Sequence, residues 1–361
     1  RAWKQFFSHS APKEIRTITP PPCRFASFFR ETLLRKRLQN GNVSIIIPSS
    51  SGAKIISYAS TLDDSGFPHR ITDLRRRRKR VVTDLKKAWK EEPFDPRPLM
   101  KNLSGRMAPG EERFRFVVFG DTELEPESQP LFDFAEQLHP DFIVHLGDIV
   151  DRGADILTMD WDRLAKRHGR LFRRIPFWPV IGNHEIRGNL KWANGSRFKQ
   201  FFGLDKDYYS FDCGRFRFII LSWSFTQQIM NGEASQSTEI DWLREELDSS
   251  TGKEVILCLH RSIHTVGRNI PPVRELENLC RQYGIRLVFG GHDHVYYRTC
   301  RDGVTYITSG MGGNRLHPLY GVGKTIEEDV YLGRKLQSEQ LVWRKTGQKT
   351  EEPFPSESHG L

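Results

Sequence analysis

The sequence predicts a layered α/β domain between residues 111 and 320. Short apolar runs alternate there with stretches of helical spacing, which is typical of strands and helices packed in layers. Five of the apolar runs also end in a glycine or a short turn followed at once by Asp, Asn or His. The chain has 361 residues and exceeds one average domain of roughly 100–200 residues, so we expect extensions on this domain.

Each element is predicted from its own pattern. Apolar runs bounded by turn residues predict strands at residues 114–119, 141–146, 176–181, 254–259, 286–289 and 304–308. Two further runs, 208–212 and 215–221, are joined through Cys213-Gly214 and predict a hairpin. Apolar residues at helical spacing predict helices at residues 129–138, 155–169, 237–248 and 271–283.

Residues 1–110 form a basic N-terminal extension that we expect to be largely disordered, and residues 321–361 are predicted to be a polar C-terminal tail. The extension carries 23 Lys and Arg against nine Asp and Glu, whereas the rest of the chain is mildly acidic. Pro20-Pro21-Pro22 and the block Arg75–Arg80 interrupt any long periodicity. The Arg75–Arg80 block could bind nucleic acid, but adjacent like charges more often form a solvated, self-repelling segment.

Apolar runs and cysteine spacing indicate the compartment in which the protein is expected to lie. No apolar run approaches the ~20 residues of a membrane-spanning helix, so we expect no membrane span. Residues 1–30 show no apolar segment followed by a small-residue cleavage site, so we expect no secretory signal. The five cysteines have wide, unpatterned spacing without a CxxC pair, which favours free thiols and a reducing compartment. We therefore expect a cytoplasmic protein.

Polar side chains follow five of the predicted strands. Because ligands of α/β sheets bind beyond the carboxyl ends of the strands, these side chains are expected to meet at one site. An Asp after a single strand is usually a turn or cap residue, but five such positions in order are hard to explain by turn chemistry alone. The side chains are those of Asp121, Asp148, Asn183, His260, His292 and His294.

This set of ligands predicts two divalent metal ions. Carboxylates, a carboxamide oxygen and imidazoles suit Mn²⁺, Fe²⁺, Zn²⁺ or Mg²⁺, and the set contains no thiolate. One bridging carboxylate would let six side chains serve two ions with open coordination positions. Such paired ions, roughly 3.5–4 Å apart, favour in-line displacement at phosphorus.

The same residues lie in motifs that resemble the signature blocks of calcineurin-like metallophosphoesterases. The blocks occur in the family's order, and the resemblance covers roughly residues 113–310. It implies a four-layer α/β/β/α sandwich with a dinuclear metal site at one edge. The matching segments are Gly120-Asp121, Gly147-Asp148-Ile149-Val150-Asp151-Arg152-Gly153, Gly182-Asn183-His184-Glu185, His260 and Gly291-His292-Asp293-His294.

The resemblance also implies roles for the metal ligands. Asp148 matches the bridging carboxylate. Asp121 and His294 would complete one metal site. Asn183, His260 and His292 would complete the other metal site.

Three further residues match positions near the metals in this family. His184 matches a histidine that helps to protonate the leaving oxygen, and Asp151 would orient its imidazole. Arg152 matches an arginine that clamps the phosphoryl group in the phosphoprotein phosphatase branch. A surface ion pair is the alternative interpretation of Asp151 and Arg152.

The segment Gly291–Arg298 is similar to the corresponding block of purple acid phosphatases and their bacterial relatives. Two positions depart from the family. Asp151 stands where purple enzymes carry the tyrosine that ligates ferric iron, so no coloured iron–tyrosinate site is expected. Glu123 stands where most other branches carry a histidine. It either replaces that ligand with a carboxylate or points away and leaves one metal with fewer ligands.

The resemblance implies a metal-dependent phosphoesterase that hydrolyses a phosphate ester through a hydroxide bridging two metal ions. A phosphomonoesterase acting on a phosphorylated small molecule is the first expectation. A phosphodiesterase or nuclease, with the basic N-terminal third holding a polyanion, is an alternative. A protein phosphatase and a non-catalytic binding module on the same fold are the others.

Overall fold

We describe a computed structural model of the chain. It describes two strands near the N-terminus, at residues 43–48 and 54–59, by their backbone alone. The Arg75–Arg80 block and most of the basic extension lie outside the described residues, and so does the possible nucleic-acid contact considered for that block. The remaining described residues are 92–105, 113–155, 159–188, 193–232, 237–268, 273–313, 316–320, 329–334, 341–344 and 352–353.

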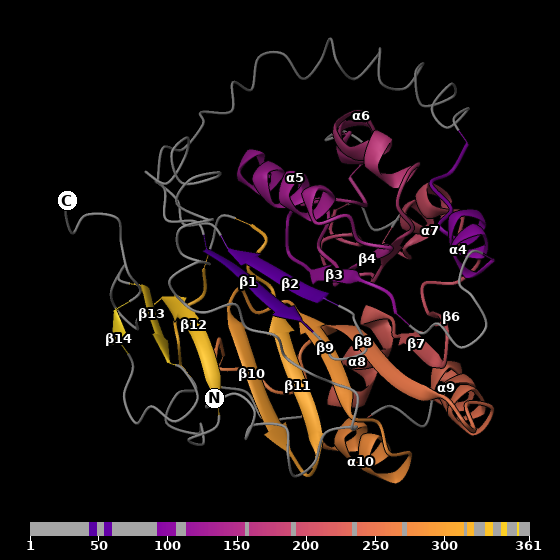
Figure 1. Cartoon of the computed structure of the whole chain (residues 1–361), viewed down its shortest axis with the longest axis vertical. Helices are drawn as coiled ribbons and strands as arrows, with labels where there is room; N and C mark the ends of the chain where they lie inside the picture. The colour runs from indigo at the N-terminus through magenta and orange to yellow at the C-terminus, as the bar shows by residue number, and fades with distance from the viewer. Residues whose placement is uncertain are drawn as a thin grey trace.

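Two β-sheets form the centre of the molecule (Figure 1). The smaller sheet is parallel and consists of β3 (Phe116–Phe119), β4 (Phe142–His145) and β5 (Phe177–Pro179). The larger sheet is mixed and has the strand order β14-β13-β12-β10-β11-β9-β8-β7-β6. Its strands are β6 (Tyr209–Cys213), β7 (Phe216–Ile220), β8 (Glu254–Arg261), β9 (Leu287–Gly291), β10 (Tyr296–Arg301), β11 (Val304–Ser309), β12 (Val330–Arg334), β13 (Leu341–Arg344) and β14 (Glu352–Pro353).

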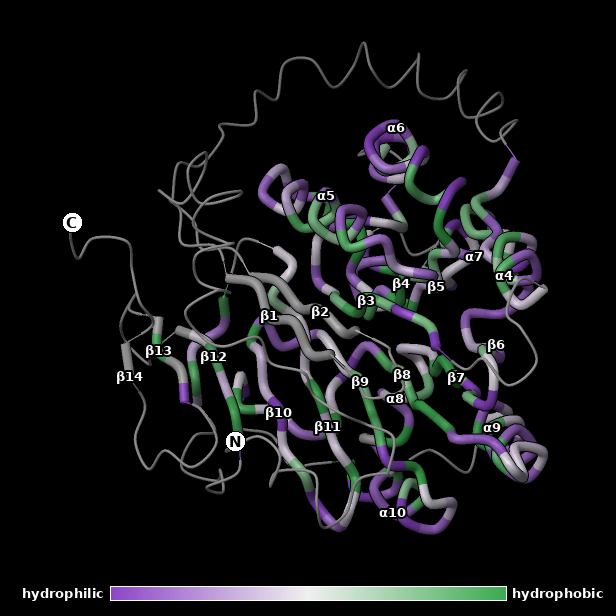
Figure 2. The backbone as a smooth tube through the Cα atoms, viewed as in Figure 1, coloured by the Kyte–Doolittle hydropathy of each residue, from purple (hydrophilic) through white to green (hydrophobic). Residues whose placement is uncertain are grey.

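Side chains of alternate strand positions divide the molecule into four layers. Because successive residues of a strand face opposite sides, β3 sends Phe116 and Val118 toward the larger sheet. The neighbouring Val117 and Phe119 pack on the other face with helices. Figure 2 shows the hydrophobic residues gathered along strands such as β3 and β7. This arrangement confirms the predicted α/β/β/α sandwich.

Helices cover the outer face of each sheet (Figure 1). The smaller sheet packs on α5 (Gln129–Gln137), α6 (Asp160–Phe172) and α7 (Ser196–Phe202). The larger sheet packs on α8 (Trp223–Met230), α9 (Thr238–Asp248) and α10 (Arg274–Gln282). None of the helices among the described residues is both long enough and apolar enough to cross a membrane.

The described parts of both flanking segments contain regular structure. In the N-terminal extension, β1 (Val43–Pro48) pairs antiparallel with β2 (Lys54–Ala59). Phe94, and Met100 of helix α4 (Arg97–Ser104), are buried in the hydrophobic core of the domain. At the other end, β12, β13 and β14 extend the larger sheet beyond residue 320. The folded unit therefore reaches past the expected limits 111 and 320, because apolar residues in both flanks find a partner surface.

Candidate metal centre

Loops from both sheets bring the six expected metal ligands together. Asp121, Asp148 and Asn183 follow β3, β4 and β5, at the carboxyl edge of the smaller sheet. His260 lies near the end of β8, where the pairing with β9 shifts register, and His292 follows β9 at once. The site is therefore built at the edges of two sheets that face each other, not along the edge of one.

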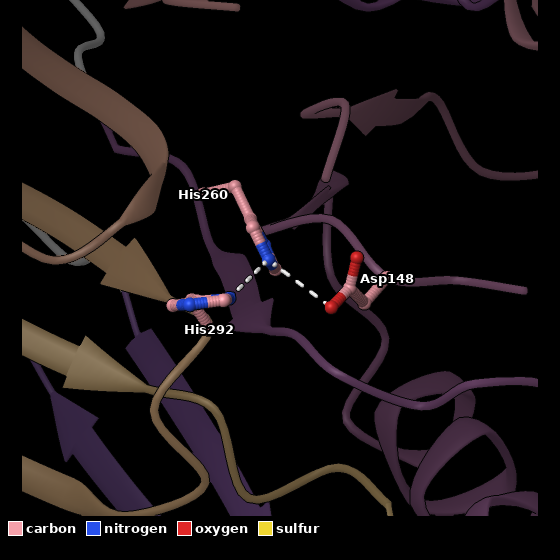
Figure 3. Close-up of side chains that lie close together, drawn as sticks. All are labelled: Asp148, His260 and His292. Atoms are coloured by element: carbon pink, nitrogen blue, oxygen red, sulfur yellow. Dashed lines mark hydrogen bonds and ion pairs between the residues drawn. The ribbon is translucent and has the colours of Figure 1, made fainter. Parts of the chain in front are cut away.

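Asp148, His260 and His292 form a compact cluster in which all three side chains are buried (Figure 3). His260 Nε2 lies 3.1 Å from Asp148 Oδ2 and 3.2 Å from His292 Nδ1. It also lies 3.2 Å from Asn183 Oδ1. Ligand atoms of Asp148, Asn183 and His292 thus surround the Nε2 atom of His260; we call these four residues the compact cluster.

In its neutral form, the imidazole of His260 is held in one tautomer. Its Nδ1 lies 2.7 Å from the carbonyl oxygen of Leu146, which can only accept a hydrogen bond, so Nδ1 carries the proton. Nε2 is then the nitrogen that faces Asp148 and can bind a metal ion. Burial lowers the pKa of His260, but the Asp148 carboxylate outweighs it and raises the pKa to about 10, so the cluster attracts positive charge.

Glu123 lies at the centre of a second, more open cluster. Its Oε1 is 3.7 Å from the Nε2 atoms of both His184 and His294. His294 Nε2 also lies 3.5 Å from Asp121 Oδ1. Glu123, His184 and Asp148 place ligand atoms close enough together for a metal ion. Glu123 therefore points into the site; we call Asp121, Glu123, His184 and His294 the open cluster.

Burial affects both acids of the open cluster, because Asp121 is buried and Glu123 is half-buried. The side chain of Asp121 has no exposed surface, and both its oxygens accept the backbone N–H of His292 at 3.0 Å. Burial raises the pKa values of Asp121 and Glu123, because a carboxylate loses its hydration there. A cation between them would offset that cost.

His184 and Asp151 make the contact that the sequence predicts. His184 Nδ1 lies 3.0 Å from Asp151 Oδ1 and 2.9 Å from the Asp151 carbonyl oxygen. Nε2 of the same ring points toward Glu123 and toward Asp148, whose Oδ2 is 3.9 Å away. Burial lowers the pKa of His184, but the surrounding carboxylates, first that of Asp151, raise it to about 9. The imidazole is thus protonated at neutral pH and aimed at the site.

A different arginine from the expected one contacts this pair. The guanidinium of Arg152 forms an ion pair with Asp155, with Nε 3.3 Å from Oδ2. Arg187 Nη1 instead lies 3.2 Å from Asp151 Oδ1 and 3.4 Å from His184 Nδ1. The phosphoryl contact expected of Arg152 stays a prediction.

Glu185 is a buried residue that the sequence analysis left without a role. Its carboxylate accepts the backbone N–H groups of Asp148 at 2.8 Å, Ile149 at 2.7 Å and Gly182 at 2.7 Å. It therefore joins the loop that carries Asp148 to the loop that carries Asn183. Its position beside His184 in the motif was the only signal in the sequence.

Trp223 walls the compact cluster. Its ring centroid lies 5.4 Å from that of His260 and 5.0 Å from that of His292. Ser222 caps α8 through the N–H of Phe225, and its hydroxyl donates to the buried Glu239 at 2.6 Å. The tryptophan is thus fixed at the first turn of a capped helix, where it confines both imidazoles.

The ligand loops have unusual backbone conformations. Positive φ angles are uncommon outside glycine and gather at functional sites, where surrounding contacts maintain them. Gly291 shows why small residues flank the ligands, since a Cβ there would lie 2.6 Å from Asp121 Oδ2. The site residues with positive φ are Asp121 (60°), Glu123 (45°), Asp148 (52°) and His292 (67°).

The donor set fits borderline or hard divalent ions. Both groups of potential ligands contain only carboxylate oxygens and imidazole nitrogens, and no cysteine belongs to either within the described part of the chain. Asp148 belongs to both groups, as a bridging ligand would. The oriented imidazole of His260 adds the supporting hydrogen bond that metal-binding histidines usually have.

Comparison with known proteins identifies the family. The model of the calcineurin-like phosphoesterase family matches residues 114–296, which is half of the chain. The chain belongs to the calcineurin-like phosphoesterase family. This match confirms the resemblance stated from the sequence. The members of this family are dimetal-dependent hydrolases.

Curated relatives include purple acid phosphatases. The chain is 29% identical over 247 residues to purple acid phosphatase 23 of Arabidopsis thaliana, a match covering 55% of this chain and 52% of that protein. It is 25% identical over 216 residues to the uncharacterized protein YvnB of Bacillus subtilis, covering 54% and 16% respectively. The chain thus spans about half the length of the first relative and less of the second.

One solved structure is also similar to this chain. The purple acid phosphatase PPD1 from yellow lupin matches with a TM-score of 0.48 and 18% identity. That match covers 66% of this chain and 52% of the lupin chain.

Proposed function

We propose that this chain is a dinuclear-metal phosphomonoesterase acting on a phosphorylated small molecule. The observation that carries the proposal is the sharing of Asp148 between two groups of potential metal ligands. Family membership supports phosphoester chemistry, and the similarity to purple acid phosphatases favours a monoester over a diester.

We assign one metal site to each cluster, and we assign His184, which also lies within ligand distance of Glu123 and Asp148, to proton donation and not to metal binding. Asp148, Asn183, His260 and His292 would hold the first ion, because their ligand atoms already lie close together. The second ion would lie between Asp148 and the residues Asp121, Glu123 and His294. Two divalent ions in such a site supply positive charge for the phosphoryl oxygens and make water a nucleophile near neutral pH.

His184 is the proposed proton donor to the leaving oxygen. Its Nε2 faces the ligand carboxylates, while its Nδ1 is held by Asp151. Asp151 fixes the ring orientation and stabilises the protonated form, so Nε2–H points at the position where the ester oxygen leaves. Glu185 keeps the two loops in register and is a positioning residue.

The proposal is tested with a pair of model substrates. The protein is loaded with Mn²⁺, Zn²⁺ or Fe²⁺ and assayed with p-nitrophenyl phosphate and bis-p-nitrophenyl phosphate. We expect hydrolysis of the monoester to dominate with at least one of the metals. A preference for the diester would contradict the monoesterase assignment and favour a phosphodiesterase on the same site. Hydrolysis of neither compound would contradict the proposed function itself.

A further inference from the structure

Arg187 presents a half-exposed guanidinium beside the proposed acid–base pair. Its backbone is fixed, because its carbonyl accepts the N–H of Ala154 at 3.1 Å and its own N–H donates to the carbonyl of His184 at 3.2 Å. Its Nη1 donates to Asp151 at 3.2 Å, yet 51% of the side chain is exposed. The backbone of Arg187 is thus held in place while its side chain is half-exposed to solvent.

Arg268 forms a comparable ion pair beside the loop of His292 and His294. Its Nε lies 2.6 Å from Asp293 Oδ1; the Asp293 side chain is 2% exposed, whereas that of Arg268 is 40% exposed. Asp293 stands in sequence between the candidate ligands His292 and His294. Arg268 therefore lies next to the loop that carries both histidines.

Glu123 lies between the two histidines whose loops the arginines contact. Its Oε1 is equally distant, at 3.7 Å, from the Nε2 atoms of His184 and His294. Arg187 contacts the His184 side of this centre, and Arg268 contacts the loop that carries His294. Two guanidinium groups therefore lie beside loops of the metal centre, each paired with a carboxylate whose residue contacts or adjoins a site histidine.

We propose that Arg187 and Arg268 bind a second anionic group of the substrate, so that the preferred substrate is a phosphomonoester carrying another phosphate or carboxylate on its alcohol portion. Guanidinium groups recognise both anions through paired hydrogen bonds. Because each side chain is already held by an ion pair, less conformational entropy is lost when it binds. The proposal rests on the phosphomonoesterase function and names its substrate class.

Matched substrate pairs test the proposal. Phosphoglycerate carries a carboxylate where glycerol phosphate carries a hydroxymethyl group, and fructose bisphosphate carries one phosphate more than fructose monophosphate. We expect the metal-loaded protein to prefer the more anionic member of at least one pair about tenfold in kcat/KM, since a hydrogen bond to a charged group commonly contributes that factor. The first pair reports a carboxylate and the second a phosphate.

Two variants then connect the preference to the arginines. Arg187→Gln and Arg268→Gln should each reduce the preference for the more anionic substrate about tenfold, mainly through KM, and lysine at either position should restore part of it. Arg244→Gln is the matched control, because Arg244 pairs with Asp241 on the exposed face of α9. It should leave the preference unchanged.

The outcomes separate this inference from the function on which it rests. Equal kcat/KM for both members of each pair would overturn the inference while leaving a phosphomonoesterase. The inference also falls if the two arginine variants slow both members by the same factor, since the arginines would then only hold Asp151 and Asp293 in place. A protein that releases phosphate from neither these substrates nor p-nitrophenyl phosphate would overturn the proposed function as well.

Discussion

The two clusters of the metal centre differ in how completely the protein alone defines them. In the compact cluster, His260 Nε2 lies within 3.2 Å of ligand atoms from Asp148, Asn183 and His292. In the open cluster, the distances from Glu123 to its two histidines are 3.7 Å. The proposed sites also differ in ligand type: the compact cluster offers two imidazoles, one carboxylate and one carboxamide, whereas the ion of the open cluster would have three carboxylates and one imidazole. The place where the edges of the two sheets meet thus offers two unlike sites that share the carboxylate of Asp148.

This difference predicts unequal metal binding. Nitrogen-rich sites suit Zn²⁺ and Fe²⁺, whereas oxygen-rich sites suit Mn²⁺ and Mg²⁺. The position of Glu123 is the specific reason, because a carboxylate stands there in place of the histidine of most other branches. A centre that holds two different ions is therefore the expected working state, and each variant below alters one cluster and spares the other.

Removing the central imidazole of the compact cluster should have the largest effect. His260→Ala eliminates the nitrogen that faces three other ligands and the hydrogen bond to Leu146. We expect the loss of one bound ion and a fall in kcat of more than about a hundredfold, since even supporting residues of metal sites contribute 10–100-fold. Metal content by mass spectrometry and phosphate release measure both effects. An unchanged metal content would mean that the compact cluster holds no ion.

Glu185→Gln should disturb both clusters through the loops. The carboxylate accepts N–H groups from the Asp148 loop and from Gly182, and an amide nitrogen cannot accept them. We expect metal affinity to fall about 10–100-fold and stability to fall by about 1–3 kcal/mol. Calorimetric metal titration and urea unfolding check these values, with the exposed Glu245→Gln on α9 as control. Wild-type metal affinity in Glu185→Gln would show that loop register does not matter.

Changing Glu123 should affect the open cluster alone. Glu123→Gln removes the negative charge between His184 and His294. The affinity of the protein for one of the two ions should therefore fall about tenfold. Glu123→His should shift the preference of that same site from Mn²⁺ toward Zn²⁺. Competition titrations with the two ions measure the shift. If neither substitution altered the binding of either ion, Glu123 would be only a neighbour of the site.

Acid should lower the stability of the whole fold through His168, a buried histidine with apolar surroundings that lies outside the metal centre. His168 is buried and stacks on Phe132 at 3.8 Å, and burial lowers its pKa to about 3. A depressed pKa means that stability is fully present above pH ~6.5 and is lost as pH falls toward 3.

The size of this acid effect is measurable. Between pH 7 and pH 5 the wild type should lose about 2 kcal/mol more than His168→Phe, as urea unfolding would measure. Equal losses would mean that the acid sensitivity comes from groups other than His168, such as the buried His145 or the metal centre. The measurement therefore separates the contribution of His168 from that of the other titrating groups.

Much of the fold could be predicted because its strands are short, apolar and bounded by turns. The run at 114–119 became β3, and 141–146 became β4, each within two residues at either end. Helices α7 and α8 were not predicted, because each is short and its apolar residues find their partners only in the folded core. Strand β12 was also missed, since Val330 and Leu332 acquire a partner only when β10 lies beside them.

The candidate ligands could be found from motif spacing, whereas their supports could not. The sequence predicts that Asp121 and His260 share a site. In the fold they come together there although Asp121 follows a strand of the smaller sheet and His260 lies in a strand of the larger one. Trp223 acquires its role only through ring contacts across the sheet edge, which no local pattern reports. Arg187 is a similar case, because its contact with Asp151 and His184 forms only when two loops fold together.

The shared carboxylate tests the central claim most directly. Wild type and Asp148→Ala are saturated with Mn²⁺ or Zn²⁺, freed of excess metal, and measured for bound metal and for hydrolysis of p-nitrophenyl phosphate. The account predicts two ions per wild-type chain, fewer than one in the variant, and phosphate release by the wild type alone. An Asp148→Ala variant that binds the wild-type metal load, in a protein that hydrolyses neither phosphomonoesters nor phosphodiesters, would contradict it.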